Sequence, residues 1–241
     1  MRKTIFLDKE IEVLVVSAGG VGTTFLMKEI NKYKKTNCPD NTDGYKHLTI
    51  PPISKRRDLK VIYVFGDPIM ATLSLFRRSY HQTQSIQMQR FYHSDFVIPM
   101  EMTLEEYLDK EKDGLFFERH LKNWQEKYRL HPTLFLKYET LFEHLETIAS
   151  FIQAPNTFLV NFPEKKERLS ALTEISENTK SRLEVFYGNF SRKIAQMPPV
   201  EIVDKKAFFI LSKKVYVLAI WDAFLKKNKF IRIIWNKLVS K

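Results

Sequence analysis

The chain has 241 residues, of which 44% are hydrophobic and 28% are charged, a composition typical of one folded domain with a sizeable core. We therefore expect a single domain over residues 1–241. The one cysteine, Cys38, excludes an internal disulfide and an all-cysteine zinc site, which favours a cytoplasmic location. No apolar run approaches the ~20 residues of a membrane span, and the first eight residues lack the apolar core of a signal peptide.

The net charge of +11 is concentrated at the C-terminal end. From residue 205 onward there are ten basic residues and one acidic residue, interleaved with aromatic and aliphatic residues at roughly helical spacing. This pattern predicts a basic amphipathic helical region at about 205–241. Such a region could contact an anionic membrane surface or another polyanion. The alternative is a pair of terminal helices that pack their apolar side on the core and keep their lysines in water. Nucleic acid is disfavoured because no recognition motif accompanies the charge.

The N-terminal third predicts three strands, one of them short, and one helix. An apolar strand is expected over Ile11–Val16, followed by a helix over Val21–Tyr33. Residues 36–57 are polar and contain three prolines, so they predict a loop with one short strand near Tyr45–Leu48. The continuous apolar run Val61–Phe65 predicts a strand that is buried on both faces.

Helix start signals follow the second strand. Asp67 is a good N-cap and Pro68 suits a first helical position, so a helix is expected from about Ile69 to Arg78. The Gln-rich stretch at 82–89 is ambiguous between helix and loop. A capping box of Thr103 and Glu106 opens a helix over 103–109.

The rest of the chain continues the alternation. A helix is predicted over Phe116–Tyr128, a strand over Thr133–Lys137 and a helix over Thr140–Ile152, whereas 162–196 is charged and helical or irregular. Strands that alternate with helices indicate an α/β fold with a central, mostly parallel sheet flanked by helices.

The turn after the first strand has the composition of a phosphate-binding loop. Residues 17–24 read Ser-Ala-Gly-Gly-Val-Gly-Thr-Thr, in which glycines let backbone N–H groups converge on an anion at the start of a helix. A tight turn that binds nothing is the simpler alternative. Thr23 stands where a nucleotide triphosphatase loop has its Lys, which disfavours a magnesium-dependent kinase, although a kinase with an altered loop stays a rival.

Four segments in order resemble the P-loop sulfotransferase family, which moves a sulfuryl group from 3′-phosphoadenosine 5′-phosphosulfate (PAPS) to a hydroxyl or amine. Gly19–Leu26 resembles the 5′-phosphosulfate loop, and Val61–Arg78 resembles the strand, R-D-P turn and helix that hold the 3′-phosphate. Leu134–Ile152 resembles the strand, Y-E dipeptide and helix, and Phe117–Trp124 resembles the E-H-x-x-x-W helix. The resemblance covers roughly residues 11–152.

The resemblance implies a P-loop sulfotransferase-like fold, PAPS as donor and no metal. It implies that Ser74 holds the 3′-phosphate with Arg77 or Arg78, and that Tyr138 lies near the adenine. The 5′-phosphosulfate would be held by the loop residues Gly19, Gly20, Val21, Gly22, Thr23, Thr24 and Phe25.

The catalytic base is expected in the stretch Lys46-His47-Leu48 before two prolines, which loosely resembles the family's K-x-H-x-P stretch. His47, with a reference pKa near ~6.5, could accept the acceptor's proton, and Lys46 is the second catalytic candidate. The alternative is a solvated loop histidine. Rivals for the base are His81, His93 and Glu101, whereas His120 is expected on a structural helix near Trp124.

Two cations of the family pattern are missing. The loop Lys falls at Gly20 and the Arg of R-D-P falls at Gly66, while the late R-K-G segment has only Arg192-Lys193 as its nearest match. Arg77 or Arg78 could replace one cation, and Lys46 or Lys28 the other. We therefore expect a sulfotransferase acting on a carbohydrate or glycolipid hydroxyl. The alternative is a catalytically degenerate binding protein of the same fold that docks on a membrane or polyanion through its basic region.

Overall fold

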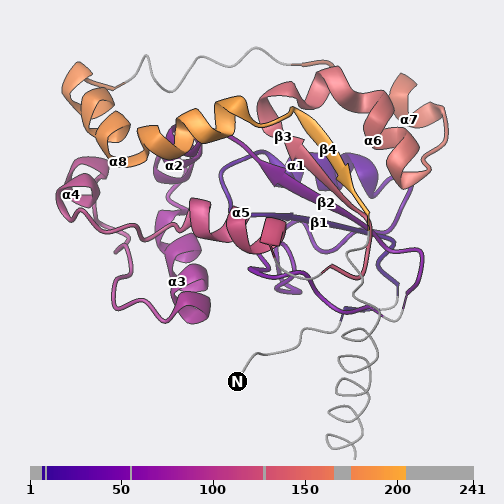
Figure 1. The fold of residues 1–241 in the computed structure, drawn as a ribbon, viewed down its shortest axis with the longest axis horizontal. Coiled ribbons are helices and arrows are strands. Elements are labelled where there is room, and N and C mark those ends of the chain that lie inside the picture. The colour runs from indigo at the N-terminus through magenta and orange to yellow at the C-terminus, as the bar shows by residue number, and fades with distance from the viewer. Residues whose placement is uncertain (1–6, 9, 55, 127–128, 166–174, 205–241) are drawn as a thin grey trace, which may run out of the picture.

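The computed structural model describes residues 7–8, 10–54, 56–126, 129–165 and 175–204 (Figure 1). The basic region predicted at about 205–241 therefore lies outside the described residues. Within them, no helix is long and apolar enough to cross a membrane.

A four-stranded sheet forms the centre of the fold, with strands β1 (Val13–Ser17), β2 (Lys60–Phe65), β3 (Thr133–Lys137) and β4 (Val200–Val203) in that spatial order. The first three strands are parallel, as the alternating elements predict. The fourth pairs antiparallel with β3 and was not predicted, because it is only four residues long and partly exposed, so its sequence carries no continuous apolar run.

Helices cover both faces of the sheet (Figure 1). Their bounds are α1 (Thr23–Ile30), α2 (Pro68–Arg77), α3 (His81–Tyr92), α4 (Leu104–Asp109), α5 (Phe117–Glu126), η1 (Tyr138–His144, a 3₁₀ helix), α6 (Leu145–Ile152), α7 (Thr157–Val160) and α8 (Glu177–Gln196).

Aromatic contacts show which helix covers which face. Tyr63 of β2 lies against Trp124 of α5, with ring centroids 5.3 Å apart. On the opposite face, Phe25 of α1 contacts Phe142 of η1, and Tyr33, just after α1, contacts Phe158 of α7. The three parallel strands are buried on both sides, which explains why their sequences are continuous apolar runs rather than alternating ones.

Most local signals are confirmed and one is wrong. The Asp67 carboxylate accepts hydrogen bonds from the N–H groups of Ile69 and Met70 at the start of α2, and Thr103 caps α4 in a capping box. The ambiguous Gln-rich stretch lies within α3. The short strand predicted at 45–48 is absent: these residues form a turn, because the Tyr45 and Lys46 N–H groups donate to the side chains of Asp43 and Asn41, and a single backbone bond, from the Ser17 N–H to the Lys46 carbonyl, joins the segment to the end of β1.

The parallel strands all end at one edge of the sheet. β1 leads into the glycine loop, β2 into Gly66-Asp67 and β3 into Tyr138. This carboxyl edge is where open α/β sheets bind ligands.

Candidate active site

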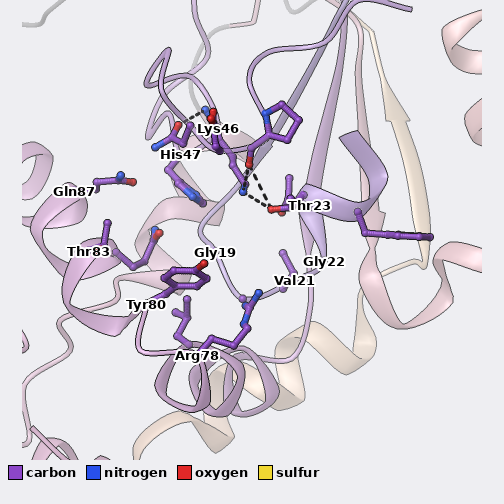
Figure 2. Close-up of a pocket in the computed structure, with 18 of the residues that line it drawn as sticks. Gly19, Val21, Gly22, Thr23, Lys46, His47, Arg78, Tyr80, Thr83 and Gln87 are labelled. Carbon is purple, nitrogen blue, oxygen red and sulfur yellow. Dashed lines mark hydrogen bonds between the residues drawn. The ribbon is translucent and has the colours of Figure 1, made fainter. Parts of the chain in front are cut away.

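A cleft of about 980 Å³ opens at the carboxyl edge of the strands (Figure 2). Its walls come from the glycine loop and α1, from the loop at 38–47, and from the stretch 75–87, which runs from the end of α2 into α3. All seven predicted 5′-phosphosulfate residues line it, as do Lys46 and His47. The structure thus brings the predicted loop and the predicted catalytic pair together in one cleft.

Glycine is required in the loop because the backbone is left-handed and other groups press against it. Gly20 has φ +78°, and an added Cβ would lie 2.6 Å from the Ala71 carbonyl oxygen. Gly22 has φ +64°, and an added Cβ would lie 2.1 Å from the Tyr138 ring. The family's loop Lys therefore cannot be restored at Gly20 without moving α2.

The loop offers free backbone donors. Among the described residues, the N–H groups of residues 20–24 make no hydrogen bond, and Gly22 caps α1 without a side chain. The Gly19 N–H is already used, since it donates to Ser17 Oγ over 3.1 Å. Free backbone donors in a glycine-rich loop at a helix N-terminus are the arrangement with which proteins commonly bind anions.

The two threonine hydroxyls point to different partners. Thr23 is buried and its hydroxyl pairs with Ser17 Oγ at 2.7 Å, so this contact holds the loop together. Thr24 Oγ1 accepts a 2.5 Å hydrogen bond from Lys46 Nζ. Of the two, Thr24 is the hydroxyl that stands beside a cation.

Lys46 lies beside the glycine loop because the loop at 37–47 is tied to β1. The Asn37 side chain exchanges two hydrogen bonds with the Val15 backbone, and the Ser17 N–H donates to the Lys46 carbonyl over 3.0 Å. The ammonium donates to Thr24 Oγ1 and, over 2.8 Å, to the Pro39 carbonyl (Figure 2).

Partial burial, followed by the nearby charge of Arg78, lowers the pKa of Lys46. A cation close to a second cation in a cleft attracts an anion.

His47 has the geometry of a general base. Its Nδ1 lies 2.8 Å from the Ser17 carbonyl oxygen, so Nδ1 carries the proton and donates it, which leaves Nε2 as the acceptor. Burial and then the charge of Lys46 lower the pKa of His47 to about 4, against the raising effect of the Ser17 carbonyl. The ring is therefore neutral at physiological pH and able to accept a proton.

The rival bases lie elsewhere. His81 is buried, with Nε2 3.1 Å from the carbonyl oxygens of both Pro99 and Met100, and it stacks on Phe76. His93 and Glu101 are exposed and do not line the cleft. His120 lies on α5 as predicted, fully buried, with Nδ1 2.7 Å from the Tyr63 hydroxyl, and burial lowers its pKa to about 3.

The predicted 3′-phosphate residues are only partly assembled. Arg78 lines the cleft and donates to the Ser74 hydroxyl over 2.9 Å, while Ser74 itself is not part of the cleft wall. Arg77 does not line the cleft, so Arg78 is the better placed of the two arginines. Tyr138 packs under Gly22 and also lies outside the cleft wall.

The turn after β2 carries negative charge where the family pattern has Arg. The Asp67 N–H donates to Glu139 Oε1 over 2.9 Å, and the Cβ of any residue replacing Gly66 would lie 2.8 Å from that oxygen. Asp67 Oδ1 caps α2, and its Oδ2 accepts a hydrogen bond from the Ser191 hydroxyl of α8. Carboxylates thus surround the position from which the family's arginine would extend.

The remaining predicted cations differ in placement. Lys28 is exposed and lines the cleft, whereas Arg192 and Lys193 are paired with Glu184 and Glu118 on the surface of α8. Among the described residues, no group of three or more His, Cys, Asp or Glu side chains could hold a metal ion.

Sequence reasoning missed the wall that α3 supplies. Tyr80, Thr83, Gln84 and Gln87 line the cleft, and Gln84 Nε2 donates to the Ala18 carbonyl over 2.6 Å. The one available signal was the spacing at 80, 84 and 87, which places these residues on one side of a helix.

Comparison with known families identifies the class of protein. The sequence model described as the sulfotransferase domain matches residues 12–195, so the chain belongs to the sulfotransferase family. Among solved structures, the chain is similar to mouse sulfotransferase SULT7A1, which was crystallised in complex with PAP. The two are 12% identical, with a TM-score of 0.40, and the match covers 79% of this chain and 89% of that one. A search of curated proteins gives no match.

Proposed function

We propose that the chain transfers a sulfuryl group from PAPS to a hydroxyl of a carbohydrate or glycolipid acceptor. One observation carries the proposal: five unbonded N–H groups at residues 20–24 lie in the same cleft as Lys46 and Arg78. The two cations supply positive charge that Gly20 and Gly66 do not. This arrangement suits a donor that is anionic at both ends.

Each residue of the cleft has a separate task in this proposal. PAPS supplies the activated sulfuryl group and a phosphate leaving group. The N–H groups of residues 20–24 and the Thr24 hydroxyl hold the 5′ end, and Lys46 stabilises negative charge that develops on the leaving oxygen. His47 accepts the acceptor's proton at Nε2, while the Ser17 carbonyl fixes the ring. Arg78 binds the 3′-phosphate, with Ser74 holding its guanidinium.

Family membership leaves the acceptor open, and the cleft favours a hydroxyl. The charged residues that line it are Lys28, Asp40, Lys46 and Arg78, and three of these four are cations. A protonated amine would be repelled, whereas a neutral hydroxyl would not. We place the reaction in the cytoplasm on the strength of the single cysteine.

A second candidate function is the non-catalytic binding protein, and the turn after β2 favours it. Glu139 beside Gly66 would weaken binding of a 3′-phosphate there. Such a protein would keep the fold and dock on a membrane or polyanion through its basic C-terminal region.

Transfer of radioactive sulfur from PAPS separates the candidates. The protein is incubated with labelled PAPS and a mixture of neutral glycans and glycolipids, with His47→Ala as the matched control. We expect label in the acceptor fraction with the wild type and about 10²- to 10⁴-fold less with the variant. PAP binding without transfer to any acceptor would support the binding protein, and absence of both would contradict the proposal.

A further inference from the structure

The cleft has two chemically different walls. Around the glycine loop stand the cations Lys46 and Arg78, whereas every cleft-lining residue of α3 is uncharged. Figure 2 shows Thr83 and Gln87 on the far side of His47 from Thr23 in this view. The charged wall suits the nucleotide, so the neutral wall is available for the acceptor.

Gln87 carries an unpartnered polar atom in the neutral wall. Its Oε1 is buried and makes no hydrogen bond with any described residue, although the residue lines the cleft. Buried polar atoms in folded proteins nearly always have a partner, so one without needs an explanation. After a small rotation of the Gln87 amide, a hydroxyl of a bound ligand would be the missing hydrogen-bond partner of Oε1. The amide NH₂ would then donate to a neighbouring hydroxyl of the same ligand.

Two neighbours extend this wall. Thr83 lies one helical turn before Gln87 and adds an exposed hydroxyl. Tyr80 precedes α3, lines the cleft and is 56% exposed, with its ring 5.4 Å from the Arg78 guanidinium. An exposed flat ring beside amide and hydroxyl groups matches a pyranose, which has an apolar C–H face and hydroxyls at its rim.

We propose that Tyr80, Thr83 and Gln87 form the acceptor subsite and bind a neutral pyranose with one hydroxyl directed at His47. The subsite deepens the proposed function and rests on it. Gln84 keeps the wall in place, because its amide is committed to the Ala18 carbonyl at the start of the glycine loop. The three subsite residues recognise the acceptor and take no part in proton transfer.

Saturation-transfer NMR on the full chain tests the subsite without relying on turnover. The probes are the methyl glycosides of glucose, galactose, mannose and N-acetylglucosamine, each with and without PAP. We expect saturation of at least one glycoside, and about tenfold weaker binding in Gln87→Leu and in Tyr80→Ala. Gln89→Leu, which makes the same change as Gln87→Leu, and Phe91→Ala, which likewise truncates an aromatic side chain, lie on α3 outside the cleft wall and should bind like the wild type.

The outcomes separate the subsite from the proposed function. Glycoside binding that depends on Gln87 but occurs without any PAP binding would support the subsite and contradict the sulfotransferase proposal. PAP binding with no saturation of any glycoside, or with saturation that neither variant changes, would overturn the subsite alone. A Tyr80→Ala variant that loses PAP affinity and keeps glycoside binding would assign Tyr80 to the nucleotide and overturn its place in the subsite.

Discussion

The loop after β1 and the turn after β2 lie at the same edge of one sheet, and both lack the cation that the family pattern has there. They differ in what has taken its place. At the loop, a lysine from a separate segment, Lys46, donates a hydrogen bond to Thr24. At the turn, Glu139 and Asp67 put carboxylates beside Gly66, and Arg78 approaches only from the far end of α2. In the function that we propose, the first region is rebuilt for an anion, whereas the second is only partly compensated.

This difference predicts a division of labour. Changes around the loop after β1 should alter the chemical step where they remove His47 and nucleotide affinity where they disturb Lys46 or the free N–H groups, because these groups meet there. Changes at the turn after β2 should alter affinity alone.

His47 should give the largest effect. Replacing it with Ala removes the base, so kcat should fall by about 10²- to 10⁴-fold while PAP affinity stays within about twofold. Steady-state kinetics and calorimetry measure the two quantities. An equal fall in affinity would assign His47 to nucleotide binding instead.

The pH profile tests the same residue. Because burial and the Lys46 charge lower the pKa of His47 to about 4, the neutral, proton-accepting form persists until the pH falls to that value. The rate constant kcat/KM should therefore stay level from about pH 7 to about pH 5 and decline only near about pH 4. In Lys46→Met the acid limb should move to higher pH, since a neighbouring positive charge is gone. An acid limb centred near the ordinary histidine pKa in the wild type would contradict this assignment.

Gly20 should give the second largest effect. In Gly20→Ala the new Cβ meets the Ala71 carbonyl at 2.6 Å, so the loop must shift and its N–H groups lose their alignment. We expect PAP affinity to fall by about 10²-fold. Gly44→Ala is the matched control, because Gly44 has a similar φ of +73° with nothing within 4 Å of an added Cβ. Equal losses in both variants would show that backbone strain alone, not loop position, is responsible.

Glu139 should give the smallest effect, and one of opposite sign. Glu139→Gln keeps an oxygen for the Asp67 N–H and removes one negative charge beside Gly66. PAP affinity should rise by about two- to fivefold with kcat unchanged, while the exposed neighbour Glu143→Gln should have no effect. Unchanged affinity would mean that the 3′-phosphate does not approach this turn, and a fall in affinity would mean that Glu139 supports nucleotide binding.

The sequence predicts what depends on local pattern. The three parallel strands are continuous apolar runs, and α2 begins at the capping pair Asp67 and Pro68. The loop after β1 is rich in glycine. Each of these elements could therefore be located without a structure. The antiparallel strand β4 and the cleft wall of α3 could not. β4 is a short, partly exposed edge, and α3 is placed against the glycine loop by the contact of Gln84 with the distant Ala18.

The position of Lys46 also depends on contacts that are distant in sequence. Asn37 pairs with Val15 across 22 residues, and this contact brings the loop at 38–47 onto the end of β1. The sequence offered Lys46 and Lys28 as equal substitutes for the missing loop cation. Only the fold distinguishes the lysine that bonds to Thr24 from the one that lies exposed on α1.

Calorimetric titration of PAP into the wild type and Lys46→Met tests the central claim most directly. Lys32→Met is the control, because Lys32 is an exposed lysine paired with Glu29 on the surface. We predict a Kd of about 1 μM for the wild type and the control, and a Kd about 10- to 100-fold higher for Lys46→Met, the loss expected for one charge-assisted contact of ~1.5 to 3 kcal/mol. No binding heat with the wild type, or equal affinity in all three proteins, would contradict the claim that Lys46 rebuilds the anion site of the glycine loop.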